Sequence, residues 1–163
     1  MSGAVCLLAA LALAACGGGG GAKSPASVSG DGYRFSAPGG WKVTRAGSSV
    51  AAVSGVKAVS VTTFPLTRPY SPRLWHEAVK ELDGVAAKLA GELRGTVADA
   101  RTVTVGGTTA RRYELAFTRN GERLVERITF VLRGRREYQL LCRFRAGKDE
   151  PACALLERSF QPG

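Results

Sequence analysis

Histidine and acidic side chains are scarce in this chain of 163 residues. It has one His and 13 Asp and Glu against 23 Lys and Arg. Zinc sites need clusters of Cys and His, and His76 has no such neighbours. A Ser-His-Asp triad needs a nucleophile on an elbow, and no Gly-x-Ser-x-Gly motif occurs. Calcium loops need acidic residues at alternate positions, and none are found. We therefore expect no metal, no cofactor and no enzymatic activity, and we interpret His76 as a surface histidine.

Long hydrophobic runs are also missing, apart from one at the N-terminus. Residues 5–15 have the length of a signal-peptide core and are too few to span a bilayer as a helix. The run ends in Leu13-Ala14-Ala15-Cys16, which resembles a bacterial lipobox, although no Lys or Arg precedes it. The resemblance implies a signal peptide over residues 1–15 and a lipidated Cys16 with two acyl chains. The alternative is an apolar N-terminal helix that happens to end at a cysteine.

The glycine-rich stretch after Cys16 raises the question of a phosphate-binding loop. Such a loop needs Gly-x-x-x-x-Gly-Lys-Ser/Thr between a buried strand and a helix. Here Ala22 separates Gly21 from Lys23, and no helical period follows. Gly and Ser chains behave as flexible linkers. The sequence therefore predicts a tether over residues 16–30 and one folded domain over residues 31–161, facing the outside of the cell membrane.

The net charge of +10 comes mostly from ten arginines between Arg111 and Arg145. Nucleic acid is a common partner of basic proteins, but no nucleic-acid-binding motif is present, so we expect none. Basic residues are attracted to anionic surfaces, which makes anionic lipid or wall polymer the better match. The alternative is a solvated arginine-rich surface without a ligand. The candidate anion-facing patch consists of Arg112, Arg123, Arg127, Arg143 and Arg145.

The pattern of apolar residues predicts four short strands, a long helix, four strands and a short helix. "GYRFSAPGGWKV" has the alternation of two strands around a Pro-Gly-Gly turn, and β-rich runs follow at residues 50–53 and 58–64. Ser71 and Pro72 suit a helix start and Gly95 a helix end. Between them, apolar residues recur at helical spacing and predict one buried face. These residues are Trp75, Ala78, Val79, Leu82, Val85, Ala86, Leu89 and Leu93.

Asn120-Gly121 is the strongest hairpin signal in the chain, because both residues tolerate the positive φ of a type I′ turn. The resulting register pairs Tyr113 with Ile128, and Glu114 with Arg127 on the reverse side. For the next hairpin we expect a three-residue loop, Arg133-Gly134-Arg135. That loop places Tyr138, Leu140, Cys142 and Phe144 on the same face as Leu124, Ile128, Phe130 and Leu132.

Two cysteines remain in the predicted domain, Cys142 on a strand and Cys153 on the last helix, which we expect over residues 149–160. An even pair in an exported protein is a disulfide candidate. A bridge closing about a dozen residues contributes roughly 3 kcal/mol in the chain-entropy model.

"GYRFSAPGGWKV" resembles the opening of PsbP-like domains, and "LLCRFRAGKDEPACALLERSF" resembles the ending of actinobacterial envelope lipoproteins of the LpqN type. The resemblance spans residues 31–161. It implies an α+β fold, an α/β/α sandwich in which a central antiparallel sheet is flanked by a long helix and a short C-terminal helix. Family members include photosystem assembly factors, partners of a small GTPase and envelope lipoproteins. No catalytic residue set carries over.

Two functions follow as hypotheses. The first is a membrane-anchored envelope lipoprotein whose domain binds an anionic lipid, a wall polymer or an envelope protein without catalysis. The second is a small envelope hydrolase or transferase that uses carboxylates such as Glu114 and Glu126. The predicted register sends these two carboxylates to opposite faces, which disfavours joint acid–base work.

Overall fold

The computed structural model describes residues 23–148 and 150–163. The predicted signal peptide, Cys16 and the predicted tether as far as Ala22 lie outside the described residues. Within them, no helix has the length and apolar character needed to cross a membrane. The elements in chain order are β1 (Ala26–Gly30), β2 (Tyr33–Ala37), β3 (Lys42–Ala46), β4 (Ser49–Ser54), β5 (Lys57–Pro65), the 3₁₀ helix η1 (Pro72–Leu74), α1 (Trp75–Glu92), β6 (Thr96–Val105), β7 (Thr108–Arg119), β8 (Glu122–Arg133), β9 (Arg136–Arg145), α2 (Pro151–Ser159) and β10 (Gln161–Pro162).

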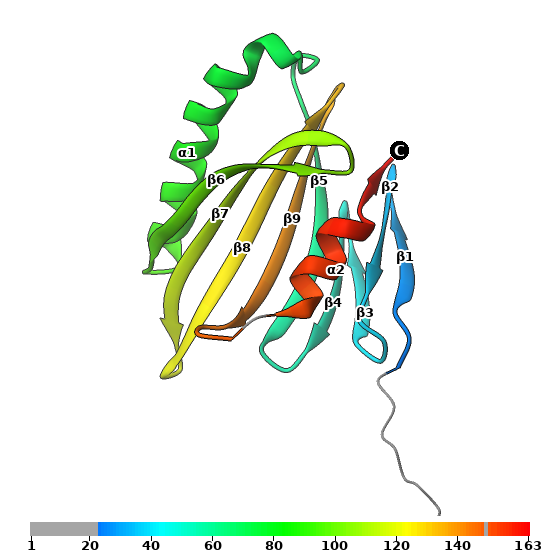
Figure 1. The fold of residues 1–163 in the computed structure, drawn as a ribbon, viewed down its shortest axis with the longest axis vertical. Coiled ribbons are helices and arrows are strands. Elements are labelled where there is room, and N and C mark those ends of the chain that lie inside the picture. The colour runs from blue at the N-terminus through cyan, green and yellow to red at the C-terminus, as the bar shows by residue number, and fades with distance from the viewer. Residues whose placement is uncertain (1–22, 149) are drawn as a thin grey trace, which may run out of the picture.

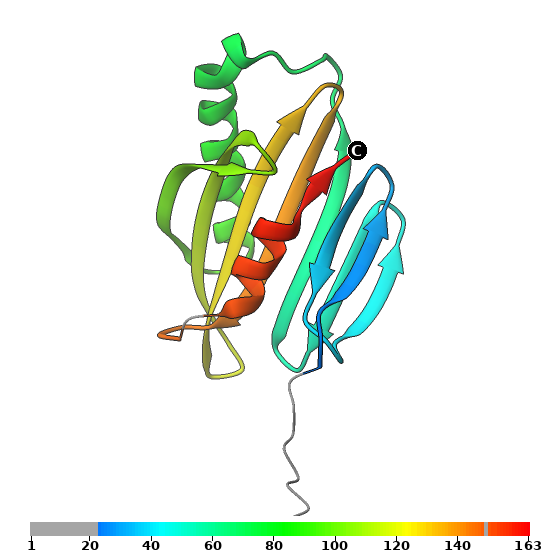
Figure 2. The same cartoon turned by 45° about the vertical axis from the view of Figure 1, so that its right-hand side comes forward.

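A seven-stranded antiparallel sheet in the order β3-β4-β5-β9-β8-β7-β6 forms the centre of the molecule. Helix α1 packs on β6 and β7 at one face, which we call the α1 face. Helix α2 covers part of the opposite face, the α2 face, together with a small sheet of β1, β2 and β10. Figures 1 and 2 show the two helices on opposite sides of the sheet. The predicted α+β sandwich is thus confirmed, with the small sheet as an addition.

The folded domain begins earlier than predicted. Residues 26–30, assigned to the tether, form β1, which pairs with β2 in antiparallel register. The Ser- and Gly-rich composition hid this strand, although Val28 is buried at 3% exposure. The strands around the Pro-Gly-Gly turn exist as predicted, but β2 lies in the small sheet and β3 at the edge of the large one.

Different local structures begin and end the long helix. Pro72 begins η1 as predicted for a first helical residue, but Ser71 makes no side-chain capping bond and α1 itself starts at Trp75. At the other end Arg94 adopts a φ of 53°, and the Gly95 N–H donates to the carbonyl of Ala90 (2.8 Å). This is the hydrogen bond of a Schellman cap.

The buried face of α1 differs slightly from the predicted stripe. Leu82, Ala86 and Ala90 are buried, whereas Val85 is 40% exposed. Ala90 was absent from the predicted face, and the inclusion of Val85 was wrong. Two of the three buried residues of α1 are alanines, whereas the larger Val85 of the predicted stripe lies outside the contact.

The β7–β8 hairpin has the predicted turn and register. Asn120 and Gly121 take φ values of 51° and 77°, as a type I′ turn requires. The confirmed pairs are Arg119 with Glu122, Phe117 with Leu124, Tyr113 with Ile128 and Glu114 with Arg127.

The predicted register of the β8–β9 hairpin is wrong by one residue. The turn has two residues, Gly134 and Arg135, because Arg133 pairs with Arg136. Tyr138, Leu140, Cys142 and Phe144 therefore lie opposite Val131, Thr129, Arg127 and Val125. Strand β8 is buried on both faces, with Ile128, Phe130 and Leu132 toward α1 and Thr129 and Val131 toward the other side. Alternation cannot fix the register of a strand whose two faces are both apolar.

Two hydrophobic cores result, one on each face of the sheet. The α1-face core joins α1 to Tyr113, Leu115, Ile128, Phe130 and Leu132. The α2-face core lies mainly over β4, β5 and β9 and includes Phe35 of the small sheet and Leu156 and Phe160 of the C-terminal segment. The strands β6 to β8 join this core through Val105, Ala110 and Val131.

Candidate binding site

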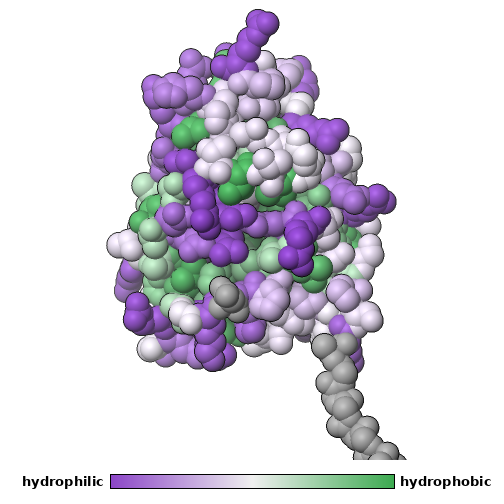
Figure 3. All heavy atoms as spheres, in the orientation of Figure 1, coloured by the Kyte–Doolittle hydropathy of each residue, from purple (hydrophilic) through white to green (hydrophobic). Residues whose placement is uncertain are grey.

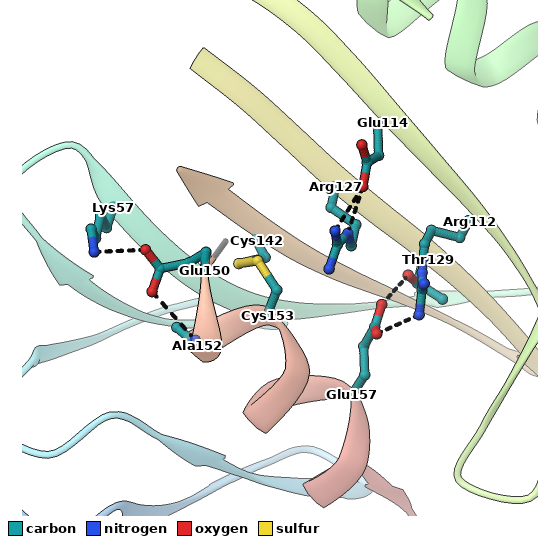
Figure 4. Close-up of a disulfide and its surroundings, with 10 residues drawn as sticks. All are labelled: Lys57, Arg112, Glu114, Arg127, Thr129, Cys142, Glu150, Ala152, Cys153 and Glu157. Atoms are coloured by element: carbon teal, nitrogen blue, oxygen red, sulfur yellow. Dashed lines mark hydrogen bonds and ion pairs between the residues drawn. A yellow bond between two sulfur atoms is a disulfide. The ribbon is translucent and has the colours of Figure 1, made fainter. Parts of the chain in front are cut away.

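Cys142 of β9 and Cys153 of α2 form the predicted disulfide, with their Cα atoms 5.4 Å apart. Both cysteines are buried, at 2% and 0% exposure. The bridge ties the short C-terminal helix to the α2 face of the sheet, as Figure 4 shows. It therefore holds the first turn of α2, where Cys153 lies, against β9.

Glu150 secures the start of α2 through two contacts (Figure 4). Its carboxylate accepts a hydrogen bond from the Ala152 N–H (3.3 Å) and forms an ion pair with the ammonium of Lys57 on β5 (2.6 Å). The Glu150 side chain is only 7% exposed, against 40% for Lys57. This is an N-cap combined with an ion pair, and it anchors the first turn of α2 to the large sheet.

A surface hollow of about 670 Å³ adjoins this pair. We call it the tether-end hollow, because the first described residues of the chain form part of its wall. Its lining combines apolar surface with cationic groups at the rim. The lining residues are Lys23, Ser24, Pro25, Pro38, Gly39, Trp41, Lys57, Glu150, Pro151, Ala152, Leu155 and Arg158.

Gly39 explains how the chain can form that wall. A Cβ atom at this position would overlap the carbonyl oxygens of Lys23 and Ser24, so only glycine allows the leading segment to pass so close. Beside it Trp41 is half-buried and packs against the α2-face core. The Pro38-Gly39-Gly40 turn, predicted as simple punctuation, thus positions one side of the hollow.

The five arginines of the predicted anion-facing patch do not share one surface. By strand register Arg112, Arg123 and Arg127 lie on the α2 face, whereas Arg143 and Arg145 lie on the α1 face. Four of them are in ion pairs. The pairs are Arg112 with Glu157, Arg127 with Glu114 (2.7 Å), Arg143 with Glu126 (2.6 Å) and Arg145 with Glu122 (2.9 Å). An anion that bound one of these four arginines would have to displace the carboxylate that already pairs with it.

Two of these pairs belong to an ion-pair cluster on the α2 face, beside α2. Glu157 of α2 pairs with Arg112 and accepts a hydrogen bond from the Thr129 hydroxyl (3.0 Å), as Figure 4 shows. Arg127 with Glu114, and Arg101 with Asp99 (3.2 Å), complete the cluster. Figure 3 shows hydrophilic residues gathered across the middle of this face. Three cations meet three carboxylates, so the cluster is electrically balanced.

Arg112 is the least exposed arginine of that cluster. Burial lowers the pKa of its guanidinium, and the nearby Arg127 and Arg101 lower it further, while Glu157 raises it. Its Nε atom is buried and has no hydrogen-bond partner among the described residues. The cluster thus fastens α2 to β7 and β8 while one donor stays open.

The carboxylates of the enzyme hypothesis lie apart. Glu114 faces α2 and pairs with Arg127, whereas Glu126 lies on the α1 face, 5% exposed, and pairs with Arg143. The predicted separation to opposite faces is confirmed. Each carboxylate is held by an arginine, and the sheet stands between them.

A second polar contact, which the sequence did not reveal, joins α1 to the sheet. The Tyr113 hydroxyl donates to the carboxylate of Asp83 (2.5 Å), and Arg111 pairs with the same oxygen (3.2 Å). Burial, and then Asp83, raises the pKa of Tyr113 to about 12. The hydrogen bond from Tyr113 lowers the pKa of Asp83. His76 lies exposed on the first turn of α1, as expected, and residues 23–148 and 150–163 contain no His, Cys, Asp and Glu group that could hold a metal.

Comparison with known proteins yields fold similarity and no family. No protein-family model and no curated protein matches the chain. A crystal structure from Bacteroides thetaiotaomicron matches 86% of this chain at 12% identity and a TM-score of 0.63, and the present chain spans about half (48%) of that longer one. LpqN of Mycobacterium tuberculosis, involved in cell envelope biogenesis, matches over 88% of this chain and 86% of its own at 12% identity and a TM-score of 0.45. Likeness at such identity shows the fold alone.

Proposed function

We propose that this chain is a lipid-anchored protein of the cell envelope whose domain binds an envelope component without catalysis. The observation that carries the proposal is the buried Cys142–Cys153 disulfide. Such bonds persist in oxidising compartments outside the cytoplasm. The lipobox-like Leu13-Ala14-Ala15-Cys16 supplies a matching export and anchoring signal. On this proposal Cys16 holds the domain at the extracytoplasmic face of the membrane.

Binding is favoured over catalysis by how the charged side chains are used. Glu114 and Glu126 are each engaged by an arginine and face opposite sides of the sheet. General acid–base work needs carboxylates that converge on one substrate. The tether-end hollow, in contrast, has the volume and the mixed apolar and cationic lining typical of a ligand site.

The anchor is tested with Cys16→Ser in the full chain. We expect this variant to lose incorporation of labelled palmitate and to leave the membrane fraction. Cys6→Ser is the matched control, because Cys6 lies inside the predicted signal peptide and should have no effect on either readout. Continued membrane attachment of Cys16→Ser would overturn the anchoring proposal.

Binding is tested on the full lipidated protein by thermal shift and by co-sedimentation. The panel holds anionic vesicles, neutral vesicles and purified wall polymer, each at two salt concentrations. A component that binds only the native state raises the melting temperature. Selective binding that partly survives salt supports the proposal. Binding of none of these components, together with hydrolysis of an ester or glycoside that Glu114→Gln abolishes, would replace it with the enzyme hypothesis.

A further inference from the structure

We infer that the tether-end hollow docks onto the anionic phospholipid headgroups of the same membrane that holds the anchor. The inference deepens the proposed function and rests on it, because it needs Cys16 to be lipidated. Its occupant is a phosphate-bearing lipid headgroup. Four features of the molecule lead to it: the place of the hollow, the length of the chain before it, the charges at its rim and the apolar part of its lining.

The hollow lies at the end of the molecule where the chain enters the fold. Strand registers define this end, which we call the tether end. The start of β1 pairs with the end of β2, the start of β3 with the end of β4, and the start of β8 with the end of β9. The turns at residues 38–41, 55–56 and 120–121 therefore gather there. Figure 1 shows that β1 begins at this same end.

Chain length keeps this end near the bilayer. Six residues lie between Cys16 and Lys23, so the Cα atoms of these two residues are at most about 25 Å apart in a fully extended chain. The ten residues of β9 extend from the tether end to the opposite end, a rise of roughly 33 Å. An acylated Cys16 thus places the hollow within reach of the headgroup layer.

The rim of the hollow carries two cations, Lys23 and Arg158, besides the paired Lys57. Lys57 is engaged by Glu150, so this pair is part of the wall. Lys23 and Arg158 are exposed, and within the described residues neither has an acidic partner within 4.0 Å. Basic side chains near a membrane are attracted to anionic headgroups. The two cations therefore suit a phosphate.

The apolar part of the hollow suits the region just below the phosphate. Trp41 and Leu155 are both half-buried, and Pro25, Pro38 and Pro151 add further apolar surface. Tryptophan favours membrane interfaces, where its ring meets acyl chains and its N–H meets polar groups. The hollow thus combines a cationic rim with an interfacial aromatic side chain.

The two tryptophans of the chain allow a direct test. Trp41 lines the hollow, whereas Trp75 starts α1 after a loop that is bonded to the opposite end of the sheet, where Leu66 and Tyr70 donate to the β8–β9 turn. Trp75→Phe leaves Trp41 as the sole reporter, and Trp41→Phe leaves Trp75. Each full lipidated variant is reconstituted into vesicles with brominated acyl chains, of phosphatidylcholine alone or with phosphatidylglycerol.

In vesicles that contain phosphatidylglycerol, we expect the brominated acyl chains to quench the emission of Trp41 and to leave the emission of Trp75 unaffected. In vesicles of phosphatidylcholine alone, we expect no such quenching. Lys23→Glu combined with Arg158→Glu should abolish this quenching. Arg133→Glu combined with Arg135→Glu is the matched control, since it changes the charge equally at the exposed turn of the opposite end and should leave the quenching unchanged.

The outcomes separate the inference from the proposed function. If the protein floats with vesicles through its anchor but Trp41 and Trp75 respond alike, the docking is overturned and the anchor stands. An equal effect of the two charge-reversal pairs overturns it as well, because it indicates non-specific attraction. If the wild-type chain does not float with vesicles, or Cys16→Ser floats equally well, the proposed function itself fails.

Discussion

The two faces of the central sheet are covered in different ways. On the α1 face one helix of 18 residues packs on β6 and β7 over an apolar core, and polar contacts such as Tyr113 with Asp83 lie at its border. On the α2 face a helix of nine residues and a small sheet cover mainly β4, β5 and β9. Beside them the ion-pair cluster of Arg101, Arg112 and Arg127 lies over β6 to β8.

The difference follows from the length of the covering elements. A long amphipathic helix removes enough apolar area from water to hold itself on the sheet. A short helix does not, and α2 uses a disulfide, a capped first turn and the contacts of Glu157 instead. The first face is therefore sensitive to loss of volume, and the second to loss of specific bonds.

The largest expected loss of stability comes from a cavity in the α1-face core. Phe130 is fully buried and meets the ring of Tyr113 edge to face at 5.9 Å. Phe130→Ala should destabilise the domain by about 3–5 kcal/mol, through lost transfer energy and the cavity that remains. Denaturant unfolding measures it. Phe64→Ala is the control, because Phe64 is 42% exposed. Equal effects of the two changes would show that Phe130 is not a core residue.

Breaking the disulfide should have the next largest effect, this time on the α2 face. Cys142→Ser with Cys153→Ser frees α2 from β9, and a loop with a sequence separation of 11 contributes roughly 3 kcal/mol. A lower melting temperature is the readout. Reductant should reproduce the loss in the wild-type chain and leave the double variant unchanged. A reductant effect of similar size on the double variant would contradict the assignment.

Local signals predicted most of this fold. The Asn120-Gly121 turn fixed the β7–β8 register correctly because both residues accept a positive φ. The start of α1 near Pro72 and its end near Gly95 were also evident from the sequence. The pairing of Cys142 with Cys153 followed from their number and placement.

Most of the features that the sequence did not predict depend on contacts between elements that are distant in the sequence. The register of β8 and β9 was missed because Phe130 and Val131 are both buried, one under α1 and one under the other layer. Strand β1 was missed for a local reason, since its Ser- and Gly-rich sequence is typical of a linker although it pairs with the neighbouring strand β2. The tether-end hollow could not be foreseen, since Lys23, Trp41 and Arg158 meet only after folding.

A smaller loss of stability is expected when a polar contact at the border of the α1 face is removed. Tyr113→Phe removes the hydroxyl that binds Asp83 and should cost about 1–2 kcal/mol, because the acceptor is charged but half-exposed. In the wild-type chain, the pKa of the Tyr113 hydroxyl is about 12 in the folded domain and about 10 in the unfolded chain. The stabilisation from neutral Tyr113 is thus complete below pH 10 and is lost as the pH rises through about 12.

Unfolding of wild type and Tyr113→Phe across this alkaline range measures that loss. The stability difference between the two proteins should shrink as the pH rises from 10 to 12, because only the wild type has this hydroxyl to ionise. A difference that stays constant would mean that folding does not raise the pKa of Tyr113.

The smallest expected effect has the opposite sign. Gly84 lies on the exposed side of α1, and a Cβ there would meet no atom within 4 Å. Gly84→Ala should therefore stabilise the domain by about 0.5–1 kcal/mol through helix propensity alone. At Gly95 a Cβ would overlap the Ala116 carbonyl, so Gly95→Ala should destabilise it. Thermal unfolding of the two variants measures both changes. A higher melting temperature for Gly84→Ala and a lower one for Gly95→Ala would show that the close contact with β7 requires glycine at position 95. Changes of the same sign would show that it does not.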